Sequence, residues 1–377
     1  MELKIMKNMS KSFVIIFVIL FTFSCSKKIK SYTENGVTYY INKNTPADDS
    51  FKIEIEKLFT LSSQVNDSIY INDISSFDID KNGNIYLLDK KQSKVFKYDD
   101  RGNYLLSFGG LGSGPGEFII RDYVVNMVCI NDRVHILMPG NKRFLIFNSD
   151  GTFIEKRDLP KQVMPTYVKK YQNNLLLGSA IMPDFSKSEM ELSNNIYLFD
   201  YSYFIQGREI YKYSKFETNS SESLTGMIPK VDFDSRGNIY IAENSSDSYR
   251  YYIFNSNKEK ISEIRKSYIK KKSNPDKKNK NSIMGNELKG FKGLDYKKSI
   301  NGIFIDHLNR VWVAVPDEEK GVKFDIFIDN IFQNSLSMDF EVNNPELFLT
   351  LEFRIYKDKI FVLNKDKLTI EVYKILN

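Results

Sequence analysis

The chain has 377 residues, of which 42% are hydrophobic and 27% are charged, a balance that excludes an intrinsically disordered protein. Its 2 cysteines and 2 histidines exclude a disulfide-rich scaffold and most zinc sites. The 28 Phe and 23 Tyr favour half-buried strands, and the formal net charge of +6 comes largely from local clusters of lysine. We therefore expect a β-rich folded protein that binds no nucleic acid.

The N-terminal segment has the composition of an export signal. Lys4, Lys7 and Lys11 precede an apolar run over residues 13–23. A membrane-spanning helix needs roughly 20 apolar residues, so this run is too short to span a bilayer but fits a signal peptide. Cys25 follows the run and stands between two serines.

This order of features resembles a bacterial lipoprotein signal. The resemblance implies that residues 1–24 are cleaved as a signal peptide and that Cys25 is lipidated. Acyl chains would attach the protein to a membrane without a spanning helix. The alternative, an ordinary secretory signal with a coincidental cysteine, stays open. Residues 25–50 are polar and lack periodicity, which predicts a flexible tether after the lipidated cysteine.

A repeated pattern organises the remaining chain. Three clear copies combine an apolar strand, a short Gly/Asn turn and a second strand, and they occupy residues 77–86, 233–240 and 303–312. Three weaker copies occupy residues 128–135, 168–176 and 353–361. Two further strands follow in most copies. Four short antiparallel strands in about 40–50 residues are typical of a propeller blade.

The last copy lacks one strand. Its three predicted strands cover residues 349–356, 359–364 and 368–375, whereas the alternating segment 51–55 has no partner of its own. Pairing that segment with the last unit would remove an exposed edge. The sequence thus predicts an all-β, six-bladed β-propeller with four-stranded antiparallel blades over residues 51–377. An N-terminal strand closes the last blade, and a basic insertion at 265–280 separates the fourth and fifth blades.

Segments 77–89, 94–98 and 108–118 resemble the NHL-type repeat, and more closely the six-bladed β-propeller lipoproteins found in Bacteroidetes. This resemblance implies a lipid-anchored protein of the cell envelope. Lys27 and Lys28 follow Cys25 where surface-exported relatives tend to carry acidic residues, which favours an outer-membrane protein facing the periplasm.

The same resemblance leaves function open, because relatives range from ligand-binding modules to lyases and lactonases. We expect a binding module that recognises a small molecule, a glycan or a partner protein at one face of the propeller. The alternatives are a lyase-like or lactonase-like enzyme acting on a sugar-derived substrate, and a structural subunit of an outer-membrane uptake complex.

Two carboxylates are candidates for chemistry in the central channel. Asp78 and Asp232 occupy equivalent positions in the predicted inner strands of the first and fourth blades. A six-bladed ring would place them on opposite sides of the axis, where paired carboxylates could bind a cation or act as acid and base. The alternative is hydrogen bonding to the backbone of the neighbouring blade.

A second candidate set starts the third strand of each blade. Four of the six equivalent positions are cationic, namely Lys94, Arg143, Arg250 and Lys323. A cationic rim would attract an anionic glycan, a carboxylate-rich peptide or an envelope protein. The alternative is local pairing with loop acids such as Asp89 or Glu243.

The remaining features favour structural roles. The glycine-rich loop 109–116 lacks the ending of a phosphate-binding loop and predicts a turn between blades. His135 occupies a packing position and His307 a turn, so we predict no metal site and no cofactor. Cys129 reads as a small core residue. The basic insertion is either solvated or in contact with anionic lipid or glycan.

Overall fold

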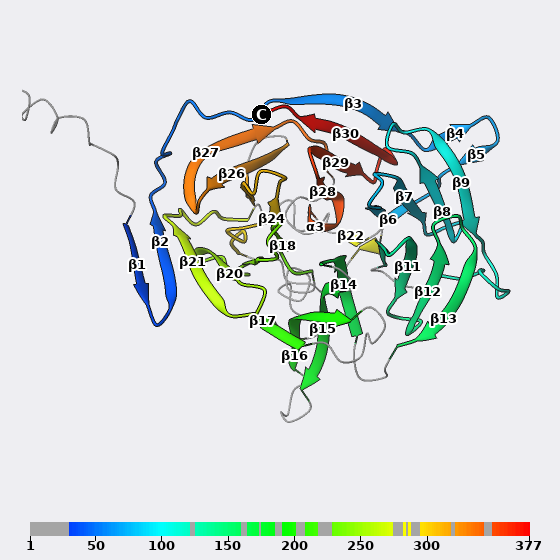
Figure 1. The fold of residues 1–377 in the computed structure, drawn as a ribbon, viewed down its shortest axis with the longest axis horizontal. Coiled ribbons are helices and arrows are strands. Elements are labelled where there is room, and N and C mark those ends of the chain that lie inside the picture. Colours follow the sequence, from blue (N-terminus) through cyan, green and yellow to red (C-terminus); the bar gives the residue numbers. More distant parts are fainter. Residues whose placement is uncertain are drawn as a thin grey trace, which may run out of the picture.

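The structure is a computed structural model, and it describes residues 30–120, 125–159, 164–172, 175–184, 191–200, 208–217, 228–273, 282–283, 286–287, 295–317, 321–342 and 349–377. Six antiparallel sheets stand radially around a central axis (Figure 1). This arrangement confirms the predicted all-β, six-bladed propeller. Residues 1–29, with the predicted signal peptide and Cys25, lie outside the described residues. No helix in the described ranges is long and apolar enough to cross a membrane.

The first strand of each blade lies nearest the axis. The first blade contains β6 (Ile74–Ile79), β7 (Ile85–Asp89), β8 (Lys94–Tyr98) and β9 (Tyr104–Gly109), and the second contains β10 (Asn126–Ile130), β11 (Arg133–Met138), β12 (Arg143–Asn148) and β13 (Phe153–Asp158). The third contains β14 (Met164–Lys170), β15 (Leu175–Asp184), β16 (Glu191–Asp200) and β17 (Arg208–Glu217). The fourth contains β18 (Val231–Phe233), β19 (Ile239–Ala242), β20 (Tyr249–Phe254) and β21 (Lys260–Lys266).

The last two blades follow the same plan. The fifth contains β24 (Gly302–Ile305), β25 (Val311–Val315), β26 (Val322–Ile328) and β27 (Ile331–Met338), and the sixth contains β28 (Phe353–Tyr356), β29 (Lys359–Asn364), β30 (Thr369–Ile375) and β3 (Ile55–Leu61). The other elements are β1 (Lys30–Glu34), β2 (Val37–Asn42), β4 (Gln64–Asn66), β5 (Ile69–Tyr70), β22 (Ser282–Ile283), β23 (Asn286–Glu287) and α3 (Leu349–Glu352).

The repeated sequence pattern corresponds to one hydrogen-bonded turn. In the first blade, Asp80 Oδ1 accepts from the backbone N–H groups of Asn82 (2.8 Å) and Asn84 (3.0 Å). Its Oδ2 accepts from the hydroxyl of Tyr86, the second residue of the next strand (3.1 Å). The same unit recurs in the fourth and fifth blades, at Asp234 and Asp306. Since all its bonds lie within seven residues, the turn can form before blades pack.

Ring closure occurs in the sixth blade, as predicted, but with a different segment. β3 pairs antiparallel with β30 from Ile55, opposite Ile375, to Leu61, opposite Ile370. The predicted closing strand at 51–55 is therefore correct only at its last residue. β30 ends at Ile375, so the residues before Ile55 have no strand to pair with. Glu54 is still held to the C-terminal residues, because its O accepts from Leu376 N–H (2.9 Å) and its N–H donates to Asn377 Oδ1 (2.8 Å).

The flexible tether predicted over residues 25–50 is wrong for residues 30–50. β1 and β2 form a hairpin, and β2 pairs in parallel with β21, which extends the fourth blade to six strands (Figure 1). The Arg265 guanidinium and the Lys260 ammonium lie over the Tyr39 ring, at 5.2 and 5.7 Å from its centroid. Hydrogen bonds and cation–π contacts order this polar segment, which offered no apolar periodicity to read.

The chain then follows the outer edge of the fifth blade. The buried Asn42 side chain accepts from Phe332 N–H (2.9 Å) and donates to Asn330 O (3.1 Å). Ala47 N–H donates to Phe332 O (3.1 Å). The basic insertion predicted at 265–280 is also shorter than expected, because Arg265 and Lys266 belong to β21; its residues 274–280 lie outside the described residues.

Candidate functional site

The two predicted channel carboxylates each link adjacent blades. Asp78 Oδ2 in β6 accepts from the backbone N–H of Cys129 in β10 (2.7 Å). Asp232 Oδ2 in β18 accepts from the N–H of Ile305 in β24 (3.0 Å), and its Oδ1 forms an ion pair with Lys169 of β14. Among the contacts of the described residues, none joins Asp78 to Asp232. Both carboxylates therefore hydrogen-bond the backbone of the neighbouring blade, which is the alternative to a channel cation or acid–base site.

The inner strands also balance these acids with bases. Burial raises the pKa of the Asp78 carboxyl, and the positive charges of Arg354 and Lys169 act in the opposite direction. Lys169 comes from the third blade and Arg354 from β28 of the sixth. Two acids, Asp78 and Asp232, and three bases, Lys169, Lys170 and Arg354, therefore share the described inner strands, which disfavours a cation site there. Lys169 was missed because the third repeat is the weakest in sequence.

The four predicted rim cations do lie at one end of the propeller, as the first or second residue of β8, β12, β20 and β26. Two of them pair with acids of their own blade. Arg143 Nε lies 3.1 Å from Asp158 Oδ1, and Arg250 Nε lies 3.0 Å from Glu243 Oε2. Lys94 stands opposite Asp89 in the strand register. The rim is therefore a set of separate, partly neutralised positions around the ring.

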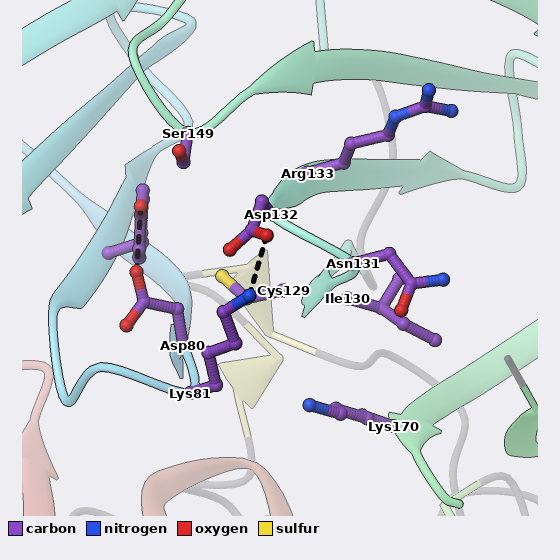
Figure 2. Close-up of a pocket in the computed structure, with 10 residues that line it drawn as sticks. Asp80, Lys81, Cys129, Ile130, Asn131, Asp132, Arg133, Ser149 and Lys170 are labelled. Carbon is purple, nitrogen blue, oxygen red and sulfur yellow. Dashed lines mark hydrogen bonds and ion pairs between the residues drawn. The ribbon is translucent and has the colours of Figure 1, made fainter. Parts of the chain in front are cut away.

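The other end of the propeller carries a narrow pocket between the first and second blades (Figure 2). Lys81 Nζ pairs with Asp132 Oδ2 across it (2.6 Å), and the Tyr86 hydroxyl donates to Asp80. Cys129 also lines the pocket, and burial raises the pKa of its thiol, which stays protonated and unreactive at neutral pH. These contacts hold the first and second blades together, so we assign the pocket a structural role and no ligand.

The strongest departure from ordinary packing lies where the fourth and fifth blades meet, at the rim end. Lys230 precedes β18 and is only 3% exposed. Its Nζ lies 3.2 Å from Asn244 Oδ1. Lys298, 7% exposed, donates to the Asn244 carbonyl oxygen (3.4 Å). Burial lowers the pKa of Lys230 to about 7, and the positive charge of Lys298 lowers it further.

The loop 243–248 connects these lysines to a surface hollow. The loop joins β19 to β20, and its Asn244 contacts both lysines. Ser299, beside Lys298, fixes the loop by donating to the carbonyls of Ser245 (3.1 Å) and Ser248 (2.6 Å). A hollow of about 330 Å³ lies beside the loop and is lined by Asp247, Ser248, Tyr249, Arg250, Arg265, Lys266 and Tyr268. The three cations of this lining are each ion-paired, Arg250 with Glu243, Arg265 with Glu263 and Lys266 with Asp325, and Tyr249 is buried.

The remaining predicted residues take structural places. His135 is 3% exposed in β11, where burial and the charges of Arg133 and Arg157 lower its pKa to about 4. His307 is exposed in a turn. In the glycine-rich loop, Phe118 N–H donates to Gly110 O (2.9 Å), which turns the chain back after β9. Within the described residues, no group of three His, Cys, Asp or Glu side chains could hold a metal ion.

Lys230 and Lys298 carried no sequence signal. Each precedes an apolar inner strand, in a position where an exposed loop lysine is ordinary. Their burial depends on the neighbouring blade and on the 243–248 loop. The repeat did not mark them either, because Lys230 directly precedes β18 whereas Lys298 lies four positions before β24.

Comparison with known proteins identifies the fold and assigns no functional site. A family model described as a 6-bladed beta-propeller matches residues 35–350. The crystal structure of an exported protein from Bacteroides fragilis is similar over 90% of this chain and 100% of its own, with 14% identity and a TM-score of 0.52. A member of the DUF4221 family from Bacteroides vulgatus is similar over 86% and 98%, with 11% identity and a TM-score of 0.50.

Virginiamycin B lyase from Staphylococcus aureus is more distant, at 8% identity and a TM-score of 0.46, over 86% of this chain and 100% of its own. Likenesses at these identities show the fold alone. The search of curated proteins found no match.

Proposed function

We propose that this chain, which belongs to the DUF5128 family of 6-bladed beta-propellers, is a binding module of the cell envelope that recognises an anionic ligand where its fourth and fifth blades meet. The ligand is an acidic glycan, a carboxylate-rich peptide or an acidic segment of an envelope protein. The buried Lys230, close to a second buried lysine, is the observation that carries the proposal. We further propose a lipid anchor at Cys25 and an outer-membrane location facing the periplasm.

The argument starts from the free energy of burying an ammonium group. Within the described residues, the contact of Lys230 Nζ is a neutral amide, and no carboxylate forms an ion pair with it. The nearest charge that affects its pKa is another lysine. A fold that keeps a cation under such conditions gains stability from any anion that reaches it. A carboxylate, sulfate or phosphate group would supply that charge and hydrogen-bond the ammonium.

The hollow beside the 243–248 loop supplies recognition beyond charge. Arg250 and Arg265, which are 35% and 40% exposed, are ion-paired with Glu243 and Glu263. Each guanidinium has five N–H donors, so the donors that these pairs leave over could bind a carboxylate or sulfate. Tyr268, which is half-buried, adds aromatic surface suited to the apolar face of a sugar ring, whereas Tyr249 is only 3% exposed. A ligand that spans the loop would place its anionic group near Lys230 and its neutral part in the hollow.

Calorimetry with inorganic sulfate, inorganic phosphate and oligogalacturonate tests the proposal. We expect Lys230→Met to weaken binding of the anionic probe at least about tenfold, because a charged hydrogen bond contributes roughly 1.5–3 kcal/mol. Lys81→Met is the matched control, since Lys81 is an exposed, ion-paired lysine at the other end of the propeller. Equal affinities for the wild type and Lys230→Met would refute the site.

Proton uptake gives a second readout. Anion binding must raise the pKa of Lys230 from about 7, so complex formation at pH 8 takes up a proton. Titrations in buffers of different ionisation enthalpy measure that proton, and Lys230→Met should abolish its uptake. Binding without proton uptake in the wild type would place the anion elsewhere.

The competing interpretation is an enzyme that acts on a sugar-derived substrate. It requires at least three converging polar groups with an activated acid, base or metal. The carboxylates Asp78 and Asp232 instead bond to the neighbouring inner strands. No observation in the described residues favours catalysis over binding, so the binding module remains our proposal.

A further inference from the structure

A short exposed segment, residues 267–272, follows β21 at the rim end of the fourth blade. Its Ile269 is 78% exposed, the largest fraction among the exposed large hydrophobic side chains of the described ranges. Lys270 and Lys272 beside it are exposed as well. An isoleucine surrounded by cations is typical of a segment that enters a lipid interface, where the apolar side chain is buried and the ammonium groups meet headgroups.

The backbone holds Ile269 outward. Ser267 N–H donates to Asn42 O at the end of β2 (3.0 Å), and Lys271 Nζ donates to Pro316 O of the fifth blade (3.0 Å). The Lys271 carbonyl accepts from Lys297 N–H (2.9 Å). Contacts on both sides therefore fix the segment to two blades, and the exposure of Ile269 belongs to the fold.

Basic residues converge on the same place from two parts of the chain. Residues 265–273 contain five basic residues and no acidic one. Lys43, directly after β2, and Lys30, which pairs with Ile41 in β2, are exposed beside this segment. Three of the five basic residues are ion-paired, Arg265 with Glu263, Lys266 with Asp325 and Lys270 with Asp247, and the pair of Lys270 lies at the surface. Such exposed pairs are weak, so the positive excess remains.

The route of the chain brings its predicted anchor to this side of the molecule. β1 begins at Lys30, only two strands from β21 (Figure 1), or about 10 Å at the usual strand spacing. Lys30 lies five positions after Cys25, and five extended residues reach at most about 18 Å.

We propose that a membrane patch, formed by Ile269, Lys270, Lys272, Lys30 and Lys43, lies against an anionic lipid bilayer and sets the orientation of the propeller. The fourth blade then faces the membrane, and the hairpin β1–β2, which pairs with β21, holds Lys30 and Lys43 beside it. The patch is argued from described residues alone, and its membrane contact does not depend on acylation of Cys25 or on the anionic ligand.

Vesicle co-sedimentation tests the patch with the chain from residue 25 onward carrying Cys25→Ser, so that no acyl chain contributes. We expect binding to vesicles with about one-third phosphatidylglycerol that weakens at high salt, and weaker binding to pure phosphatidylcholine. Ile269→Glu should reduce binding at least about tenfold, and Lys272→Ala about fivefold. The matched control is Leu308→Glu: Leu308 is 55% exposed in a turn at the opposite end, and this variant should bind as the wild type does.

Three results would overturn the patch: equal binding to both kinds of vesicle, unchanged binding by Ile269→Glu, or an equal loss in Leu308→Glu. The fluorescence of the single tryptophan shows that each variant is folded. The patch and the ligand site fail separately, because Ile269→Glu should leave oligogalacturonate affinity unchanged while Lys230→Met should leave vesicle binding unchanged. If Ile269→Glu instead lost oligogalacturonate binding, the segment would bind an anionic glycan, and this result would also overturn the patch.

Discussion

Replacing Lys230 by methionine removes a buried ammonium group while keeping an unbranched side chain of similar length. Lys230 is 3% exposed, and its pKa falls from 10.5 to about 7 in the folded state. That fall corresponds to a cost of roughly 5 kcal/mol for holding the protonated form inside the protein. Lys230→Met should therefore raise the free energy of unfolding at pH 7 by a few kcal/mol, reduced by the lost hydrogen bond to Asn244.

The pH dependence is the sharper expectation. Below pH 7 the lysine is protonated in both the folded and the unfolded state, so it contributes no slope. Between pH 7 and 10.5 the unfolded chain binds a proton that the folded chain lacks, and wild-type stability rises with pH. The stability advantage of Lys230→Met should shrink by roughly 3 kcal/mol between pH 7 and about 9.5.

Urea denaturation at pH 7, 8 and 9.5 measures this difference. Trp312, the single tryptophan, is fully buried in the fifth blade and reports unfolding by fluorescence. Staying below pH 10 avoids the tyrosines, whose pKa values burial raises. Lys81→Met, an exposed lysine, controls for the general effect of removing one charge. Parallel pH profiles for the wild type and Lys230→Met would show that Lys230 is fully solvated when protonated, which would refute the reasoning.

Three further predictions concern the fold. Between pH 6.5 and 4, His135→Leu should lose roughly 3 kcal/mol less stability than the wild type, because the unfolded histidine binds a proton that the folded one, with a pKa of about 4, does not. Acid titration followed by circular dichroism measures this difference, and identical profiles for the two proteins contradict it. Asp232→Ala should lower the free energy of unfolding by about 3–5 kcal/mol in urea denaturation, since it leaves the half-buried Lys169 without its ion-pair partner and the N–H of Ile305 without its acceptor. A loss below about 1 kcal/mol would contradict the inter-blade link. A chain that starts at Asp48 should keep a cooperative thermal transition, whereas one that starts at Ser62 lacks β3 and should lose it; equal melting of the two would show that closure is not required.

The sequence determined those features whose bonds are local. The turn at Asp80 closes through donors within six residues, so its pattern appears in the chain as a repeat and predicts the blades. The inner strands β10 and β24 could be predicted for another reason, because both are buried along their whole length and so appear as continuous apolar runs. The missing strand of the last blade likewise predicted closure, but the register with β30 moved the closing strand to Ile55.

Tertiary structure decided what depends on a neighbouring blade or on a distant segment. The hairpin β1–β2 pairs with a strand more than 200 residues away, and no local periodicity marks it. Lys230 is charged and polar by composition, yet the fourth and fifth blades close around it. Burial and electrostatic fields are properties of the assembled ring, because they depend on which side chains the packing places within a few ångströms and on how much water it removes.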